Sequence, residues 1–389
     1  MRQKIKDAVK AEFPNTVQYR RYIHQNPCLS FEEGETADYI CKQLEQAGID
    51  YERCGLNGIV ARIKGKKEGP CIAFRADFDA LPIQEPEGLP FASCKKGVMH
   101  ACGHDFHAAS LLSLARIFRA NQEWVCGEVV FIFQYAEELP PGGAAPMIEA
   151  GCLESVDRIY GMHVSDELDS GDIGICPGKY MAASDHFIVE FTGSGGHGSR
   201  PGDTQDTVSA AASAVLQINS IVSRFISPLR SAVISVCNVH GGQVYNIIPA
   251  TVRLEGTVRS YEAETTELII KHIRNISESC ANIYGTGCNF EYEYGYSAVV
   301  NSLREADIVS KASEKMGLKV RQIEPTPVGE DFSAYLEKIP GAFFRVGIRN
   351  EALDAVYPLH NRKFKIDEDA FVAAMEAFLG IYFEETEQL

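Results

Sequence analysis

The chain has 389 residues, more than a single hydrophobic core usually supports, so we expect two domains with well-buried interiors. Its formal charge is −16 and it has no basic run, which argues against a nucleic acid or an anionic membrane as partner. No apolar stretch reaches the roughly 20 residues that cross a bilayer, and the N-terminus lacks the apolar core of a signal peptide. The twelve cysteines are scattered beside hydrophobic residues, so we expect reduced thiols and a cytoplasmic protein.

Helix and strand patterns alternate over the first part of the chain. The N-terminal segment 1–15 has the mixed charges of a short amphipathic helix. Two further helices and three apolar strands are expected over 35–49 and 107–122, and over 58–65, 71–79 and 127–138. This alternation predicts an α/β domain with a central mixed sheet, in which functional residues gather at the strand ends.

A different order of elements begins near Ser184. Strands are expected over 185–194, 231–242, 250–260 and 289–295, and helices over 207–224 and 264–285. The order strand, helix, strand, strand, helix, strand is typical of a ferredoxin-like domain. We therefore expect an inserted domain of about 110 residues. It would span 184–295, within a catalytic domain formed by 1–183 and 296–389.

The segment MHACGHDFHAA, residues 99–109, holds three histidines, one cysteine and one aspartate. Cys102 and His104 are one residue apart, so their side chains point the same way in an extended or looped stretch. A thiolate with an imidazole is a common pair of metal ligands. Two other interpretations stay open on this segment alone. One is a buried cysteine beside a structural histidine; the other is a cysteine nucleophile with a histidine base, which also needs an orienting acid and an oxyanion hole.

Glu137 and Glu138 follow the apolar strand VVFIFQYA and precede a Pro-Pro-Gly-Gly turn. Solvated surface charge is the ordinary interpretation of two such glutamates. Adjacent residues of an extended chain face opposite sides, however, so one can bind a metal while the other acts as a base. His163 in RIYGMHV and His360 in VYPLHNRKF are each flanked by apolar residues. Singly each is typical of a core histidine, but together with the other features they favour a metal site.

Motifs that occur in order over almost the whole chain resemble those of one enzyme superfamily. They include RADFDALPI, MHACGHDFHAA, FQYAEELPPGGA, GMHV, GGHGSRP, YNIIP, GEDFS and PLHNRKF. In these motifs the chain is similar to the zinc-dependent aminoacylase and carboxypeptidase superfamily. The similarity is strongest to its N-acyl-amino-acid amidohydrolase branch, which includes hippurate hydrolases and auxin-conjugate hydrolases. So many motifs in one order make the resemblance specific.

The resemblance implies a site for two divalent metal ions. Cys102 would bridge the ions, and the implied ligands are Cys102, His104, Glu138, His163 and His360. Glu137 is implied as the general base that deprotonates the attacking water. Two cations about 3.5–4 Å apart lower the pKa of a shared water and polarise the scissile carbonyl. Zinc or manganese is expected, and the mixed donor set also admits cobalt or nickel.

One motif departs from the superfamily pattern. Elsewhere in the superfamily a His-x-Asp pair stands where this chain has Arg75 and Asp77, so Arg75 replaces a ligand histidine, as in the amidohydrolase branch. Asp77 is expected to orient a metal ligand, or alternatively to cap the following turn. His100, Asp105 and His107 receive no defined role; support of the ligands is expected of them rather than metal binding.

His197 in GSGGHGSRP and Asn246 in GGQVYNIIP lie in the inserted domain. A histidine in a glycine-rich loop is ordinarily a turn residue. The resemblance implies instead that His197 stabilises the tetrahedral oxyanion in a partner subunit, across a homodimer formed by the inserted domains. Asn246 is expected to donate a second hydrogen bond, and Gly195 and Gly196 to allow close backbone approach. Glu330 in GEDFSAYL is explained by its position at a helix N-terminus, and the resemblance implies that it lines the substrate pocket.

The sequence therefore predicts a metal-dependent amidohydrolase that cleaves N-acyl or N-aroyl amino acids into a carboxylic acid and a free amino acid. The inserted domain is expected to close as a lid. The nearest alternative is a metal-dependent dipeptidase or exopeptidase, which would need an acidic partner for the substrate's α-amine. A non-catalytic protein of the same fold is disfavoured because the implied ligands and base are all present. A cysteine hydrolase would stay active after chelation.

Overall fold

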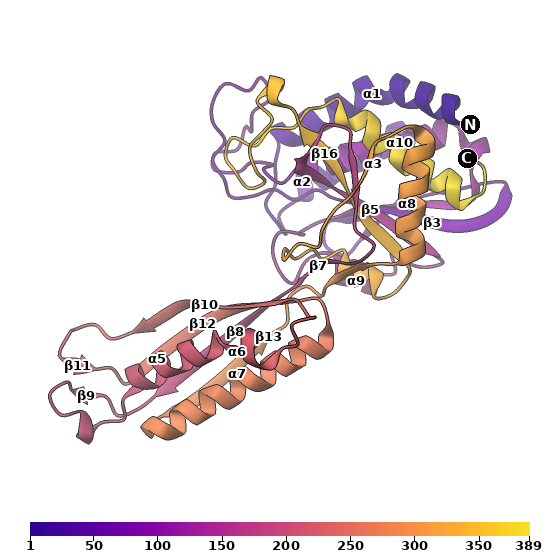
Figure 1. The fold of residues 1–389 in the computed structure, drawn as a ribbon. Helices are drawn as coiled ribbons and strands as arrows, with labels where there is room; N and C mark the ends of the chain where they lie inside the picture. Colours follow the sequence, from indigo (N-terminus) through magenta and orange to yellow (C-terminus); the bar gives the residue numbers. More distant parts are fainter. The chain divides into compact units, whose positions relative to one another are not determined.

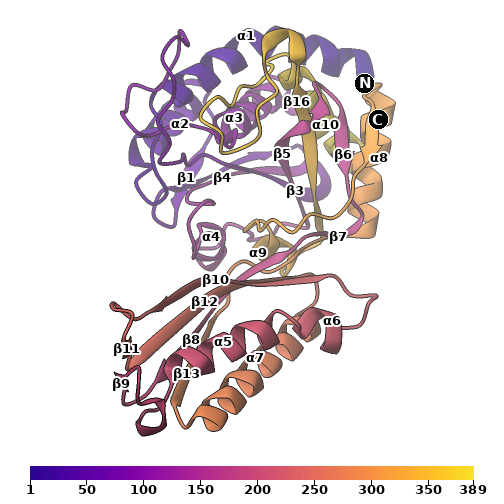
Figure 2. The same ribbon diagram turned by 60° about the vertical axis from the view of Figure 1, so that its left-hand side comes forward.

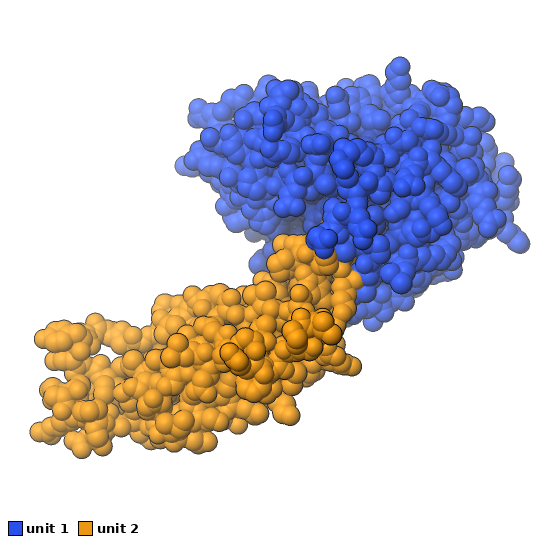
Figure 3. Space-filling model, viewed as in Figure 1, with its two compact units in different colours: residues 1–178, 300–324, 331–389 blue, residues 179–299, 325–330 orange.

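The structure, a computed structural model, describes residues 1–389 and divides them between two units (Figure 3). The first unit comprises 1–178, 300–324 and 331–389, and the second comprises 179–299 and 325–330. The inserted domain expected over 184–295 falls within the second unit, and its exact bounds stay a prediction. No helix combines the length and the apolar character needed to span a bilayer.

The first unit is built on an eight-stranded mixed sheet with the order β1-β2-β4-β3-β5-β16-β6-β15 (Figures 1 and 2). The strands span Tyr51–Cys54 (β1), Gly58–Lys64 (β2), Lys67–Asp77 (β3), Cys126–Gln134 (β4), Arg158–Asp169 (β5), Ile173–Ile175 (β6), Val320–Gln322 (β15) and Gly341–Arg349 (β16). The central strands β4, β3, β5 and β16 run parallel. Their long buried stretches are typical of strands covered on both faces. The expected α/β unit with a central mixed sheet is confirmed.

Helices of very different burial accompany this sheet. They span Arg2–Gln25 (α1), Gly34–Gln46 (α2), His104–Ala120 (α3), Ala144–Glu149 (α4), Leu303–Met316 (α8), Ser333–Leu336 (α9) and Ala370–Glu385 (α10), with short 3₁₀ turns at Gln122–Trp124 and Glu351–Leu353. Helices α1, α3 and α10 pack on one another. Almost every residue of α3 and α10 is buried, so these two helices belong to the core of the unit.

Helix α1 is longer than expected, because the helix predicted over 1–15 continues through Pro14 to Gln25. Pro14 removes a backbone donor and costs roughly 3 kcal/mol inside a helix. Tyr19 and Ile23 lie on the buried face of the following turns. Burial of each such side chain contributes about 1.5–3 kcal/mol, so packing compensates for the proline.

The second unit contains a four-stranded antiparallel sheet with the order β10-β12-β8-β13. Its elements are Ala183–Thr192 (β8), Thr207–Ile218 (α5), Ile221–Phe225 (α6), Ala232–Gly241 (β10), Thr251–Ser260 (β12), Ala263–Tyr284 (α7) and Gly287–Glu293 (β13). The short strands Gly196–His197 (β9) and Ile247–Ile248 (β11) pair with each other, and a 3₁₀ turn spans Pro201–Asp203. The short strands Gly178–Met181 (β7) and Val299–Asn301 (β14), which also pair with each other, contain the residues at which the chain passes from one unit to the other. The expected ferredoxin-like order is confirmed, although the helix predicted over 207–224 is divided at Asn219 and Ser220.

One apolar core holds the second unit together. Phe187 and Val189 of β8 and Leu254 of β12 belong to the same buried cluster as Ile269 and Ile273 of α7. The two helical residues are four positions apart, as expected for one face of an amphipathic helix. The sheet and helices of this unit therefore bury a core of their own.

A glycine in this core gives a test of its packing. A Cβ at Gly256 of β12 would lie 2.3 Å from the Phe187 ring and 2.5 Å from the Ser235 carbonyl oxygen. Gly256→Ala is expected to lower the free energy of unfolding by about 1–3 kcal/mol through overpacking. Urea denaturation followed by circular dichroism measures the change. Gly202→Ala, whose Cβ would meet nothing within 4 Å, is the matched control; equal midpoints for the two variants would contradict this packing.

Candidate metal centre

Polar side chains gather beyond the carboxyl ends of the central parallel strands. Strand β3 ends at Asp77 and β4 ends at Gln134, shortly before Glu137 and Glu138. Strand β5 extends beyond this edge. Arg75 of β3 pairs with Gly161 of β5, and Asp77 and His163 follow two residues further along their strands. The parallel register thus brings segments that are far apart in the sequence to one edge of the sheet.

Five of the sequence-predicted side chains converge there. The Cys102 sulfur lies 3.3 Å from His163 Nε2 and 3.3 Å from His360 Nε2. Glu138 Oε1 lies 3.2 Å from His360 Nε2 and 3.9 Å from His104 Nε2. Cys102 belongs to two groups of possible donors, one with His104 and His163 and one with Glu138 and His360, and His104 forms a third group with Glu137 and Glu138. The first two groups therefore share the Cys102 thiol.

Two of the histidines are held so that Nε2 faces the cluster. His104 Nδ1 lies 3.0 Å from Asp79 Oδ1, and His163 Nδ1 lies 2.8 Å from the Val164 carbonyl oxygen. Each oxygen accepts a hydrogen bond from the Nδ1–H group, which leaves the Nε2 lone pair for a metal ion. His104 Nε2 is buried and has no hydrogen-bond partner. An orphaned buried nitrogen of this kind fits a missing cation.

The charges around the cluster also fit a cation. Burial, and then the carboxylates of Glu138 and Glu137, raise the pKa of the Cys102 thiol well above its usual value. Burial opposes protonation of His104, yet the carboxylates of Asp77 and Asp79 raise its pKa to about 10. His104 therefore holds a proton among these carboxylates, at a position where a metal ion would supply the positive charge instead. One thiol, imidazoles and carboxylates form a donor set that suits zinc and related divalent ions.

The raised pKa of Cys102 bears on the cysteine-nucleophile interpretation. A nucleophilic cysteine works as a thiolate, which a nearby cation or helix N-terminus normally stabilises. Here burial and the carboxylates of Glu138 and Glu137 favour the protonated form of the thiol. Metal ligation, in which the ion itself stabilises the thiolate, agrees better with this environment.

Glu137 lies beside the same donors. It is buried, and its Oε2 atom lies 4.0 Å from His104 Nε2. The preceding residue, Ala136, has a positive φ of 50°, a conformation uncommon for a residue other than glycine. Its backbone N–H donates to Glu33 Oε1 at 2.8 Å. This bend leads the chain out of β4 and sets Glu137 and Glu138 next to the donors.

His360 is placed by a turn instead of a regular element. Its φ is 62°, and its backbone N–H donates to the Ala101 carbonyl oxygen at 2.8 Å. The side chain remains half-exposed. A left-handed conformation at a residue with a Cβ persists only where surrounding contacts enforce it, and such residues cluster at functional sites.

Asp79 is the residue that sequence reasoning missed. Its Oδ1 atom orients His104, and its Oδ2 atom accepts hydrogen bonds from the Glu138 backbone N–H at 3.0 Å and from the Ser30 hydroxyl at 2.7 Å. One carboxylate therefore fixes two of the converging residues. The signal was present in RADFDALP, because residues 77 and 79 of an extended chain point to the same side.

Asp77, which was expected to orient a ligand, acts one step further away. It accepts hydrogen bonds from Arg75 Nη1 and His107 Nδ1, each at 2.6 Å. His107 Nε2 in turn accepts from the Val164 backbone N–H at 3.0 Å. Both nitrogens of His107 are thus engaged, which leaves none for a metal. Through His107, Asp77 holds the strand next to His163; a direct catalytic role for Asp77 stays a prediction.

Three further residues that the sequence analysis named, Asp105, His100 and Glu330, are buried. Asp105 accepts hydrogen bonds from Arg20 Nε at 3.0 Å and His24 Nδ1 at 2.8 Å. Burial opposes its ionisation, but Arg20 and His24 lower its pKa. His100 has no hydrogen-bond partner, and burial lowers its pKa to about 3. Glu330 is also buried, in the segment 325–330 of the second unit.

Within the second unit the structure brings the remaining predicted residues together. His197 of β9 pairs with Ile247 of β11, and the Gly198 N–H donates to the Asn246 carbonyl oxygen at 2.8 Å. The His197 side chain is exposed and contacts the Ser199 hydroxyl at 3.0 Å. Gly195 has φ of 60°, and a Cβ there would lie 2.9 Å from a backbone oxygen. Gly196 is the first residue of β9.

Comparisons with known proteins agree with this geometry. Residues 73–383 match the sequence model of peptidase family M20/M25/M40. The N-acetylcysteine deacetylase of Bacillus subtilis (strain 168) is 39% identical over 373 residues, which cover 95% of this chain and 97% of that protein. An N-acyl-L-amino acid amidohydrolase of Geobacillus stearothermophilus is 38% identical over 301 residues, 77% of this chain and 81% of that protein. The YXEP crystal structure of Bacillus subtilis, described as a dinuclear metal binding peptidase from the M20 family, superposes with a TM-score of 0.86 at 35% identity, covering 98% of this chain and 99% of that one.

The hydrogen bonds by which Asp79 holds His104 and Glu138, here called the Asp79 clamp, can be tested directly. Asp79→Ala is expected to weaken zinc binding or turnover by about 10–100-fold, as is usual when the partner of a metal-binding histidine is lost. Isothermal titration with zinc and steady-state kinetics measure the two effects, and circular dichroism verifies folding. Asp50→Ala, which removes an exposed carboxylate, is the control. A folded Asp79→Ala protein with unchanged zinc affinity and turnover would contradict the clamp.

Proposed function

Because the chain belongs to peptidase family M20/M25/M40, we propose that it uses two divalent metal ions to hydrolyse the amide bond of N-acyl or N-aroyl amino acids. The products are a carboxylic acid and a free amino acid. The observation that carries the proposal is the convergence of one thiol, three imidazoles and a carboxylate, most of them buried, at the ends of parallel strands, with a second carboxylate beside them.

We assign as metal ligands Cys102, His104, Glu138, His163 and His360. Two of the donor groups share the Cys102 sulfur, which supports this residue as the bridging ligand. When bound, the two ions lower the pKa of a water molecule and polarise the substrate carbonyl. Zinc or manganese is the proposed metal, because the donors include sulfur, nitrogen and oxygen.

Glu137 is the proposed general base. Its carboxylate accepts a proton from the attacking water while the water oxygen bonds to the amide carbon. It then returns the proton to the amide nitrogen as the carbon–nitrogen bond breaks. Its position supports this role, because Glu137 is buried beside His104 but belongs to neither donor group that contains Cys102.

The second unit is proposed to complete the site of a partner subunit as a lid. We assign His197 as a donor to the developing oxyanion, Asn246 as a second donor, and Gly195 and Gly196 as the positions that allow close approach. Glu330 is proposed to line the substrate pocket. The exposed side chain of His197 agrees with a partner outside its own unit.

An unpaired strand edge supports the homodimer. Strand β10 lies at one edge of the four-stranded sheet. Val239 of this strand and Leu216 of α5 are exposed, by 57% and 75%, and both line an apolar groove with Val208. Edge strands and apolar patches of this kind are usually covered by a partner. The twelve cysteines are free, which supports a cytoplasmic location.

Hydrolysis of defined amides tests the chemistry. Chelated enzyme is assayed with N-acetyl, N-benzoyl and N-indoleacetyl amino acids, acetyl-diaminopimelate and simple dipeptides, with and without zinc or manganese. Activity on N-acyl amino acids should return only with metal. Glu137→Gln should lower kcat by about 10²–10⁴-fold and keep its metal content, whereas the exposed control Glu149→Gln should not change. Activity that survives chelation would contradict metal catalysis and favour a Cys102 nucleophile.

The dimer can be tested at the strand edge. Val239→Lys places a charge on β10, and it should convert the protein to a monomer with a loss of turnover, because His197 of one subunit would no longer reach the other. Light scattering after size-exclusion chromatography measures the mass. Leu303→Lys changes an exposed leucine of the first unit, 71% exposed, and should leave a dimer. A monomeric wild type, or a fully active monomeric Val239→Lys protein, would contradict this proposal.

A further inference from the structure

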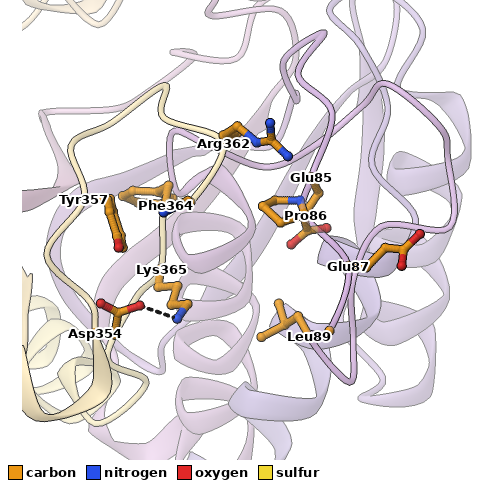
Figure 4. A pocket seen from close by; sticks show the side chains of 11 residues that line it. Glu85, Pro86, Glu87, Leu89, Asp354, Tyr357, Arg362, Phe364 and Lys365 are labelled. Carbon is orange, nitrogen blue, oxygen red and sulfur yellow. Dashed lines mark hydrogen bonds and ion pairs between the residues drawn. The ribbon is translucent and has the colours of Figure 1, made fainter.

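A hollow of the first unit lies between the segment 85–89 and the segment 354–365 (Figure 4). Its volume is about 370 Å³. None of the proposed metal ligands lines it. Pro86, Leu89 and Phe364 give it apolar walls, and Phe364 is buried. A hollow of this size and character suits a small organic molecule.

Most charged groups around this hollow already have partners. Lys365 forms an ion pair with Asp354 at 2.9 Å, as Figure 4 shows. The Lys363 ammonium lies 5.3 Å from the centre of the Tyr357 ring, where a cation–π interaction holds it. These two lysines are therefore engaged within the segment 354–365 itself.

The carboxylate of Glu85 is also engaged. One carboxylate oxygen forms a hydrogen bond with His24 Nε2 at 2.9 Å, and the other accepts a hydrogen bond from the Ser93 backbone N–H at 2.6 Å. Glu87 is exposed, and Figure 4 shows its carboxylate directed away from the opposite wall. Neither acid therefore neutralises a cation inside the hollow.

Arg362 is the charged residue of the lining that remains. It is exposed and forms no ion pair, and Figure 4 shows its guanidinium directed toward the segment that carries Glu85 and Pro86. A guanidinium offers parallel N–H donors that match the two oxygens of a carboxylate. The hollow thus combines one uncommitted anion-binding group with apolar walls.

We propose that this hollow is a second ligand site, which binds a small monocarboxylate with an apolar body. The carboxylate pairs with Arg362, and the body lies against Leu89, Pro86 and Phe364. The apolar walls favour an organic acid over inorganic phosphate. The choice of a carboxylic acid rests on the proposed function, because the acid released from an N-aroyl amino acid belongs to this class.

Both walls of the hollow connect to the metal centre. Glu85 contacts His24, and His24 contacts Asp105, which directly follows His104 in α3. On the other wall, Arg362 follows the strained turn of His360 by two residues. A ligand between the walls would therefore contact two segments that each lead to the metal centre.

Benzoate is the probe for this proposal. Titration calorimetry on the full-length, metal-loaded protein compares wild type, Arg362→Gln and the control Arg224→Gln, which changes an exposed arginine of the second unit. Loss of a charged hydrogen-bonding group should weaken benzoate binding by about tenfold or more in Arg362→Gln only. Benzamide and inorganic phosphate should each bind at least tenfold more weakly than benzoate. Equal benzoate affinity of Arg362→Gln and wild type would overturn the proposal, as would binding of phosphate as tight as that of benzoate.

Hydrogen exchange locates the bound benzoate. Protection of the segment 85–89 is expected on addition of benzoate, because this wall carries no metal ligand. Protection confined to the segments around Cys102, Glu138 and His163 would place benzoate at the metal ions and overturn the proposal. A protein that binds benzoate at 85–89 but hydrolyses no N-acyl amino acid would refute the proposed function alone. An active hydrolase without this protection would refute the second site alone.

Discussion

The centre of the first unit depends on how the charge of its buried carboxylates is balanced. Burying an ionised carboxylate is costly unless a cation or several donors accompany it. Arg75 meets this need for Asp77 and Asp331, with nitrogen–oxygen distances of 2.6 and 2.7 Å. Burial opposes protonation of His104, yet the carboxylates of Asp77, Asp79 and Glu138 raise its pKa to about 10. Two divalent ions would supply the missing charge and explain why these groups are gathered.

The converging side chains differ in how firmly the fold places them. His104 begins a buried helix and His163 lies within a central strand, so regular elements fix both. Glu138 and His360 lie on irregular segments, and single backbone hydrogen bonds to Asp79 and Ala101 hold them. Functional groups often combine a rigid scaffold with loops in this way. The loop-borne residues are the ones that a neighbouring ligand can influence.

Much of this arrangement could be predicted from the sequence, because it rests on local pattern. The apolar strands, the ferredoxin-like order and the clustered motifs each have a short-range signal. The sequence also allowed Cys102 and Glu138 to be paired as candidates through motif order. The sequence could not provide the distances between side chains of different strands and helices. The packing of α3 against the end of β3 decides that Asp79 contacts His104 while Asp77 contacts His107.

Other features depended on tertiary contacts that no local pattern contains. Helix α1 passes through Pro14 because the turns beyond it are buried against neighbours. The positive φ values of Ala136 and His360 arise at residues with no intrinsic preference for that conformation. The Ala136 N–H donates to the Glu33 carboxylate, and the His360 N–H donates to the Ala101 carbonyl oxygen, so contacts with distant parts of the fold hold both bends. Strain of this kind is visible only once the surrounding structure is known.

The most direct test of a two-metal centre is anomalous diffraction from crystals of the protein equilibrated with zinc. Two anomalous peaks should appear, both beside the Cys102 sulfur, one next to His104 and His163 and the other next to Glu138 and His360. A protein that binds no zinc at these residues, or that binds it only elsewhere in the first unit, would contradict the assignment of these side chains as ligands.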